Sequence, residues 1–361
     1  MTSDEAVKAA ISLFQAHDIA GAERLLRAAV RADPASYSGY FCLAELLERT
    51  GREDEAVACY ETCMRQRPGM AQASTRRALI LLRRHLGLAA NPPTRALNQK
   101  ARGVVQMTTL GANGRFGNQL LQYAFLRSYA ERFGFDFEVP DWIGRPLFGL
   151  DDPLISRPLP QVKETEADLA GCLAGRRDSI FVNVDFWGYF TGDTSILAPW
   201  RDRIRSWFQV REDLASPIMT DIRHLTKDDG TLVALHLRRG DFGTGPHWIA
   251  PESWYTSWLA EMWSTWRNPR LYIATDDPAT YRHFAAYQPV TAADLRPSPP
   301  GVEFLVDFLA LRSADVAAVS NSSFSVLATM LADAPQHAVR PDREGGRLVR
   351  YNPWSSPVLS G

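Results

Sequence analysis

The sequence is poor in cysteine, in long apolar runs and in net charge, and each shortage excludes a class of protein. Three of its four cysteines (Cys42, Cys59, Cys63 and Cys172) fall in one short segment, with no matching pair of Cys or His. Neither a disulfide framework nor a tetrahedral zinc site is therefore expected. No run approaches the roughly 18 apolar residues of a membrane span. The 40 Lys and Arg against 41 Asp and Glu lack the basic excess of a nucleic-acid binder.

What remains is the composition of an ordinary globular protein. Hydrophobic residues at 45% and charged residues at 22% exclude wholesale disorder, and 361 residues suffice for two or three domains. The N-terminus MTSDEAVKAA carries acids where a signal peptide would be basic. We therefore expect reduced thiols and a cytoplasmic location, with attachment to the surface of the inner membrane left open.

A period of 34 residues is present before residue 70. Small or apolar residues and a proline recur at that interval: Ala22, Leu26, Ala29 and Pro34 match Ala56, Tyr60, Cys63 and Pro68. The pattern resembles the tetratricopeptide repeat, a helix–turn–helix unit of that length. It predicts helical repeats over residues 1–90, with residues 71–88 as a capping helix. Such a segment binds peptides or partner proteins, or it packs and dimerises, and both functions stay open.

A linker is predicted over residues 91–103, where the periodicity ends at Pro92 and Pro93. Beyond it, short β-rich runs alternate with helical stretches such as 118–133, a pattern typical of parallel sheets covered by helices. The expected fold is α/β, with two Rossmann-like halves over residues 104–215 and 216–361. Ligands of such folds bind beyond the carboxyl ends of strands, so the motifs there are examined next.

The first of three strand-end motifs is GRFGNQ, residues 114–119, which leads into a helix. Gly114 and Gly117 permit a tight turn and a close approach of backbone to a ligand. Asn118 lies at the start of the helix, where free N–H groups face outward. A purely structural turn has the same appearance, so this motif alone is weak.

The second motif is HLRRGD, residues 236–241, at the end of the strand TLVALHL. Strand alternation sends His236 and Arg238 to one face and Arg239 to the other. We expect Arg239 to pair with Asp241, because two arginines at the mouth of a buried strand need anionic partners. Arg238 is then free to bind a phosphate through two parallel hydrogen bonds.

The third motif is SNSSFS, residues 320–325, between a strand and a helix. Hydroxyls and backbone N–H groups at a helix start form an anion site. Ser and Asn also serve there as N-caps, and the two roles are compatible.

Together, GRFGNQLLQYAF, HLRRGDF and SNSSFS resemble the α-1,2-fucosyltransferases of glycosyltransferase family 11, within the GDP-fucose fucosyltransferase superfamily. Gly188-Tyr189-Phe190 and Asp307 add to the resemblance, which covers residues 104–335. It implies a GT-B fold, GDP-fucose as donor, inversion at the anomeric carbon and no required metal. Residues 104–215 would then lie on the acceptor side and residues 216–361 on the GDP-fucose side. In this family two tryptophans usually follow the Ser-rich loop, where this chain has Val326 and Leu327.

The resemblance also implies roles for individual residues. Those near the reacting groups would be Arg238 and Asn118, and we add Asp241 and His247 because they are the nearest candidate bases in the sequence. Those that bind the donor would be His236, Arg238, Asp307, Ser322, Ser323, Phe324 and Gly117. Arg238 would contact the β-phosphate, and Asp307 would recognise the guanine or the ribose. Asp241 and His247 are alternative bases for the acceptor hydroxyl.

One acid pair permits a different interpretation. Asp276 and Asp277 follow a strand, as do the metal-binding acids of the other glycosyltransferase fold. Because Pro278 comes next, the pair suits a helix N-terminus equally well, and no metal site is predicted.

The expected activity is metal-independent transfer of fucose from GDP-fucose to a glycan, α-1,2 to a galactoside of a bacterial surface polysaccharide. Two alternatives are a protein or glycopeptide fucosyltransferase whose repeats bind the acceptor, and a non-catalytic tetratricopeptide scaffold. Intact HLRRGD and SNSSFS motifs favour an enzyme. Binding of a protein partner through the repeats and self-association through them both stay open.

Overall fold

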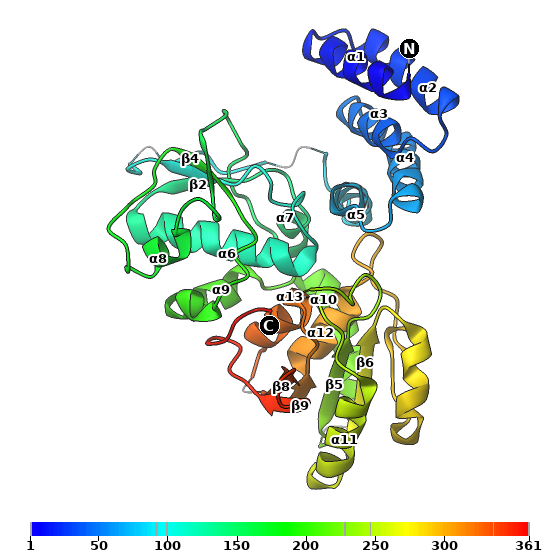
Figure 1. Cartoon of the computed structure of the whole chain (residues 1–361), viewed down its shortest axis with the longest axis vertical. Helices are drawn as coiled ribbons and strands as arrows, with labels where there is room; N and C mark the ends of the chain where they lie inside the picture. Colours follow the sequence, from blue (N-terminus) through cyan, green and yellow to red (C-terminus); the bar gives the residue numbers. More distant parts are fainter. Residues whose placement is uncertain are drawn as a thin grey trace. The chain divides into compact units, whose positions relative to one another are not determined.

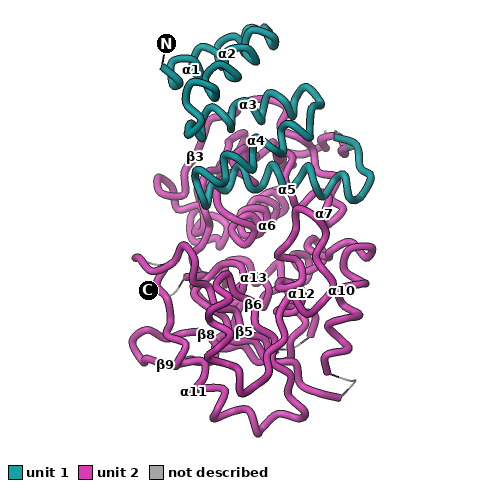
Figure 2. The backbone as a smooth tube through the Cα atoms, turned by 90° about the vertical axis from the view of Figure 1, so that its right-hand side faces the viewer, with its two compact units in different colours: residues 1–93 teal, residues 94–361 magenta. Residues whose placement is uncertain are grey.

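The structure is a computed structural model that describes residues 2–90, 93–98, 100–226, 229–245, 247–334 and 336–359. The chain divides into two compact units, residues 1–93 and 94–361 (Figure 2). Within the described residues, no helix combines the length and the apolar character that a bilayer crossing requires. The predicted linker includes Asn91, Pro92 and Gln99, which lie outside the described residues, and its boundaries stay a prediction.

The first unit is all-α, as expected. Its described part contains α1 (Ser3–Gln15), α2 (Ile19–Ala32), α3 (Tyr37–Arg49), α4 (Glu53–Gln66) and α5 (Ala71–His85). Polar residues begin the first three helices: Thr2 forms a capping box with Glu5, and Asp18 and Ser36 accept N–H groups of α2 and α3. Consecutive helices pack against each other, α1 on α2 and α3 on α4.

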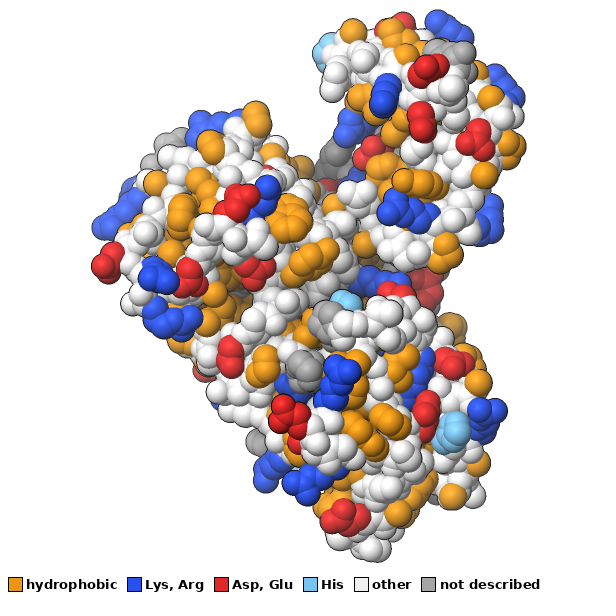
Figure 3. Space-filling view, viewed as in Figure 1, with side chains coloured by type: hydrophobic (Ala, Val, Ile, Leu, Met, Phe, Trp, Pro, Cys, Tyr) orange, Lys and Arg blue, Asp and Glu red, His pale blue; other side chains and the backbone are white. Residues whose placement is uncertain are grey.

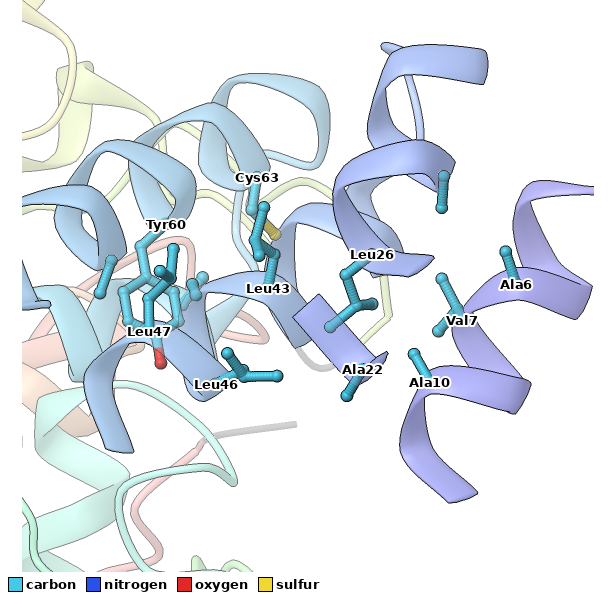
Figure 4. Packing of buried hydrophobic residues seen from close by; sticks show 14 of the residues in the cluster. Ala6, Val7, Ala10, Ala22, Leu26, Leu43, Leu46, Leu47, Tyr60 and Cys63 are labelled. Carbon is cyan, nitrogen blue, oxygen red and sulfur yellow. The ribbon is translucent and has the colours of Figure 1, made fainter. Parts of the chain in front are cut away.

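The residues that recur with the 34-residue period form the core of this unit. Ala22, Ala29 and Ala56 are buried, so the helices approach closely at these positions. Figure 4 shows Leu26, Tyr60 and other labelled side chains of the cluster pointing into the space between helices. The 34-residue period therefore arises from the packing of helix on helix.

The second unit contains two sheets. The first sheet has the order β2-β1-β4-β3 and is parallel throughout. Its strands are β1 (Val104–Gln106), β2 (Asp136–Glu138), β3 (Gln161–Lys163) and β4 (Val184–Trp187). Its helices are α6 (Phe116–Phe133), α7 (Gly144–Phe148), α8 (Leu169–Leu173) and α9 (Arg201–Trp207), with the 3₁₀ helix η1 (Thr194–Trp200). We call this part, residues 104–207, the first half.

The second sheet has the order β6-β5-β7-β8-β9, with only β9 antiparallel in the described chain. Its strands are β5 (Leu232–Leu237), β6 (Arg270–Thr275), β7 (Val316–Ala318), β8 (His337–Asp342) and β9 (Arg347–Arg350). Its helices are α10 (Glu212–His224), α11 (Glu252–Met262), α12 (Leu305–Ser313) and α13 (Ser323–Met330), with 3₁₀ helices η2 (Trp263–Thr265), η3 (Pro278–Tyr287) and η4 (Ala292–Asp294). We call residues 212–350 the second half.

This architecture confirms the predicted fold class, an α/β chain with two Rossmann-like halves after an all-α segment (Figure 1). Apolar residues on one face of β5 pack against α11, which covers that side of the second sheet. On the surface drawn in Figure 3, Lys and Arg side chains are interspersed with Asp and Glu, in keeping with the net charge of −1.

The end of the chain returns to the first half. Thr194 Oγ lies 2.8 Å from the carbonyl oxygen of Pro353 and 3.0 Å from that of Ser356. The Val358 N–H donates to the Gly192 carbonyl at 3.1 Å. In the second half, the Trp354 indole N–H donates to the Met330 carbonyl at 3.0 Å. Residues 353–358 therefore join the two halves.

Part of the segment expected to be a linker is bound to the α/β unit. Arg95 pairs with Asp136 at 2.6 Å, and the Asn98 N–H donates to the same carboxylate at 2.5 Å. Burial opposes ionisation of Asp136, but these donors outweigh it and hold its pKa below the usual value. Residues 95–98 thus satisfy a buried charge of the first sheet.

Candidate functional site

The three motifs follow strands, and two of them meet at one sheet edge. HLRRGD ends β5, and SNSSFS lies between β7 and α13. Because β5 and β7 are adjacent parallel strands, both motifs lie at the carboxyl edge of the second sheet. GRFGNQ follows β1 of the first sheet and begins α6, which packs against α13 (Figure 1).

The first and third motifs touch at Gly117. A β carbon on Gly117 would lie 2.5 Å from the Phe324 amide nitrogen and 2.6 Å from the Ser323 carbonyl carbon, so only glycine fits. Beside this contact, the Phe116 ring lies 4.3 Å from that of Phe304. The first turns of α6 and α13 are therefore in direct contact, whereas the Asn118 side chain lies against Gly114 in the turn before α6.

Both helices begin without a side-chain cap. Within the described chain, neither Arg115 at the N-cap of α6 nor Ser322 at the N-cap of α13 accepts a capping hydrogen bond through its side chain. Helix α13 begins at Ser323, within the SNSSFS motif rather than after it. Ser322 and Ser323 thus lie at the positive end of a helix dipole, where an anion is stabilised.

The pairing expected within HLRRGD is wrong. Arg238, not Arg239, forms the ion pair with Asp241, and Arg238 also contacts Asp276 at 2.7 Å. Arg239 instead pairs with Glu252 of α11 at 3.0 Å. Arg239 projects to the face covered by α11, where Asp241 does not lie. Arg238 is therefore held by two carboxylates rather than left free.

The carboxylate of Asp276 organises this cluster. One oxygen accepts the Arg239 backbone N–H at 2.7 Å, and the other contacts Arg238. Its neighbour Asp277 caps η3 by accepting the Ala279 N–H at 3.0 Å. Both acids of the pair thus have partners in the protein, and the prediction of a site without metal stays a prediction.

Asp241 links the second motif to the first. It is 52% exposed and lies 3.1 Å from Arg115, in addition to its pair with Arg238. The guanidinium of Arg238 lies 5.4 Å from the Phe242 ring, which in turn is 4.9 Å from the His247 ring. Of the two candidate bases, Asp241 therefore contacts Arg238 directly, whereas the exposed His247 contacts the Phe242 ring that Arg238 faces.

His236 is buried beneath this cluster. Its Nδ1 lies 2.7 Å from Ser320 Oγ, and its ring is 5.3 Å from that of Phe324. Burial lowers the pKa of His236 to about 4, so the imidazole is neutral at physiological pH. A neutral imidazole bound through Nδ1 presents its other nitrogen for one further hydrogen bond.

Asp307 lies apart from the cluster but faces the same side of the sheet. On the first turn of α12, it accepts the Tyr272 hydroxyl at 2.6 Å. Tyr272 pairs in register with Ala234, two residues before His236, so Tyr272 and His236 project from one face. Burial raises the pKa of Asp307 to about 6, and the Tyr272 hydrogen bond offsets part of that rise.

Sequence reasoning missed Arg115, Phe242, Glu252 and Ser320 as members of the site. Arg115 and Ser320 belong to motifs already singled out, and a charge or hydroxyl at a strand end was the available signal. Glu252 carries no such signal, because it reaches Arg239 from α11, on the other side of the sheet.

No protein-family model matches the chain, and no curated protein matches it. Among solved structures it is similar to the α-1,6-fucosyltransferase NodZ from Bradyrhizobium, soaked with GDP-fucose, at 14% identity over 70% of this chain and 99% of that one, with a TM-score of 0.47. POFUT1 in complex with GDP-fucose matches at 12% identity over 68% and 99% of the two chains, with a TM-score of 0.40. MamA matches 24% of this chain at 20% identity and a TM-score of 0.23, and the chain spans half the length of MamA.

Proposed function

We propose that this chain transfers fucose from GDP-fucose to a hydroxyl of a glycan acceptor, with inversion at the anomeric carbon and without a required metal. The linkage is α-1,2 to a galactoside of a bacterial surface polysaccharide. The observation that carries the proposal is the meeting of the three motifs, through Gly117 against Phe324 and Arg115 against Asp241. They gather cations and two helix N-termini around one point, which suits a diphosphate.

Arg238 is the principal phosphate ligand in this proposal. The β-phosphate displaces Asp241, the more exposed of its two carboxylate partners at 52% against 25% for Asp276. Asp276 stays in place because the Arg239 backbone also holds it. The guanidinium thus keeps its orientation while it exchanges one anion for another.

Transfer breaks the bond between fucose C1 and the β-phosphate oxygen, and the electron pair leaves with GDP. The positive N-terminal end of α13 and the guanidinium of Arg238 stabilise that charge. His236 is neutral, so it donates a hydrogen bond to the phosphate without repelling Arg238. Asn118, in the first turn of α6, holds the acceptor hydroxyl in this proposal. Asp307, whose carboxylate also accepts the Tyr272 hydroxyl, accepts guanine N–H groups in this proposal.

The acceptor oxygen bonds to C1 and gives its proton to a base. Of the two candidates, we assign the base to His247. Asp241 stays paired with Arg115 after the phosphate takes its place on Arg238, whereas His247 is exposed.

Thermal shift of the full chain with GDP, UDP and CDP tests the donor, and release of GDP from GDP-fucose with EDTA present tests transfer chemistry without a metal. We expect stabilisation by GDP alone and turnover that survives the chelator. Equal stabilisation by all three nucleotides, or none by GDP, contradicts the assignment.

A further inference from the structure

One aromatic side chain of the first half is exposed where its neighbours are buried. Tyr189 follows β4, at the carboxyl edge of the first sheet, and is 40% exposed. The flanking aromatic residue Phe190 is buried, as is Phe186 before it. The Trp187 ring, partly buried, meets the Tyr189 ring edge to face at 6.2 Å. Two aromatic rings thus share one edge of this sheet.

The backbone that carries Tyr189 is held on both sides. One carboxylate oxygen of Glu164 accepts the Tyr189 N–H at 2.9 Å and the Phe190 N–H at 3.0 Å. The Gly188 carbonyl accepts the Gln122 amide at 3.0 Å and the Asn113 amide at 3.4 Å. Every residue from 188 to 190 therefore has a fixed partner.

Phe190 adds a strained conformation to this segment. Its φ of 54° lies in the left-handed region, which is strained for a residue other than glycine. Its ring stacks on that of Phe125 at 3.9 Å with an interplanar angle of 12°. Strain of this kind persists where surrounding contacts enforce it, and here the Glu164 hydrogen bond and the Phe125 ring hold Phe190 in place beside Tyr189.

We propose that Tyr189 and Trp187 form the surface on which a pyranose ring of the acceptor glycan stacks. A sugar presents an apolar C–H face that an aromatic ring covers, while the Tyr189 hydroxyl can bond to ring hydroxyls. The Asn113 contact places this surface beside the GRFGNQ loop, which begins at the next residue. The inference rests on the proposed function and names the acceptor contact on the first half.

A backbone that is already ordered before binding suits this task. A sugar offers little apolar area, so binding gains from an aromatic ring whose position costs no further ordering. A peptide acceptor would instead depend on main-chain hydrogen bonds, and two aromatic rings that meet edge to face supply none. We therefore assign the surface to a saccharide, and the peptide becomes an outcome of the test.

The test is saturation-transfer NMR on the full chain with saturating GDP. The probes are methyl glycosides of the common hexoses and N-acetylhexosamines, including methyl β-galactoside, together with a serine- and threonine-containing peptide. We expect the ring C–H protons of at least one glycoside to be saturated most. Tyr189→Ala should weaken that binding about tenfold or more, whereas Tyr189→Phe should stay within about threefold of wild type.

Ile180→Ala is the matched control, since Ile180 is 55% exposed but precedes β4, at the opposite edge of the sheet. It should bind the glycoside as wild type does. Unchanged binding by Tyr189→Ala, binding of the peptide alone, or no glycoside bound by the wild type would each overturn the inference. Tyr189-dependent glycoside binding without any GDP shift would support this surface and count against the proposed donor instead.

Discussion

Gly117 on α6 lies against the Phe324 amide on α13, at a distance that leaves no room for a β carbon. Alanine at this position would push the two helix starts apart, and with them the first and third motifs. We expect Gly117→Ala to lower the free energy of unfolding by about 1–3 kcal/mol, the usual cost of overpacking, and to weaken GDP binding. Urea unfolding and GDP titration measure the two effects.

Gly192→Ala provides the control, because nothing lies within 4 Å of a β carbon added there. It should leave both quantities nearly unchanged. If Gly117→Ala bound GDP as tightly as wild type, the contact would be dispensable for the site.

Arg238→Ala should reduce kcat about 100-fold or more, because a charge-assisted contact to the leaving group strengthens as the bond breaks. Its effect on stability should be small, since Asp276 keeps its hydrogen bond from the Arg239 N–H. Initial rates with GDP-fucose give kcat. Arg267→Ala, which removes an exposed pair with Asp229, is the comparison and should retain full activity. A fully active Arg238→Ala enzyme would refute the proposed role.

Arg239→Ala should act on stability. Arg239 is 8% exposed, and its partner Glu252 is 32% exposed, so the loss is screened in part and should reach about 1–2 kcal/mol. A double-mutant cycle with Glu252→Ala, followed by urea unfolding, isolates the pair. Additive effects of the two substitutions would show that the ion pair contributes nothing.

Asp307→Asn should stabilise the protein at neutral pH. The raised pKa of Asp307 means that its protonated form is favoured by folding, so its contribution is present below about pH 4 and lost as pH rises through about 6. Asparagine keeps an acceptor for Tyr272 and removes the buried charge. The gain should be on the order of 2 kcal/mol at pH 7.5 and vanish near pH 4.

Unfolding at several pH values between 4 and 8 follows that gain. The same variant should lose its preference for GDP over UDP, since the ionised carboxylate is the proposed guanine acceptor. A gain in stability without loss of the preference for GDP over UDP would show that Asp307 does not recognise the donor.

A chain that begins at Thr94 should keep GDP binding, whereas one that begins at Arg102 should be less stable. The shorter chain loses Arg95 and leaves the buried Asp136 with fewer partners, at a cost of about 2 kcal/mol once the partial exposure of Arg95 is allowed for. Thermal shift with and without GDP compares the two.

Acceptor kinetics and oligomeric state then report on the helical unit. If it binds the acceptor, its removal raises KM for the native acceptor, and if it dimerises, the oligomeric state changes. A Thr94 chain that matches the full chain in both would exclude both functions.

The sequence predicted the elements and the motif positions but not the partners across the fold. Period 2 along β5 correctly separated Arg238 from Arg239. It did not find Glu252, because that acid reaches Arg239 from a helix whose packing no local pattern encodes. The nearest acid in sequence, Asp241, was therefore paired with the wrong arginine. Likewise the glycine at 117 suggested a close approach, but only the packing of α6 on α13 identifies Phe324 as the neighbour.

The return of residues 353–358 to the first half has a consequence for how the protein is made. Thr194 finds its carbonyl partners 159 and 162 residues later in the chain. Contacts of such sequence separation form slowly, because a long loop must close first. During synthesis Thr194 of the first half therefore stays without these partners until the second half and the residues after it have left the ribosome. A chain that terminated after β9 would contain both halves, but the first half would lack its contacts with residues 353–358.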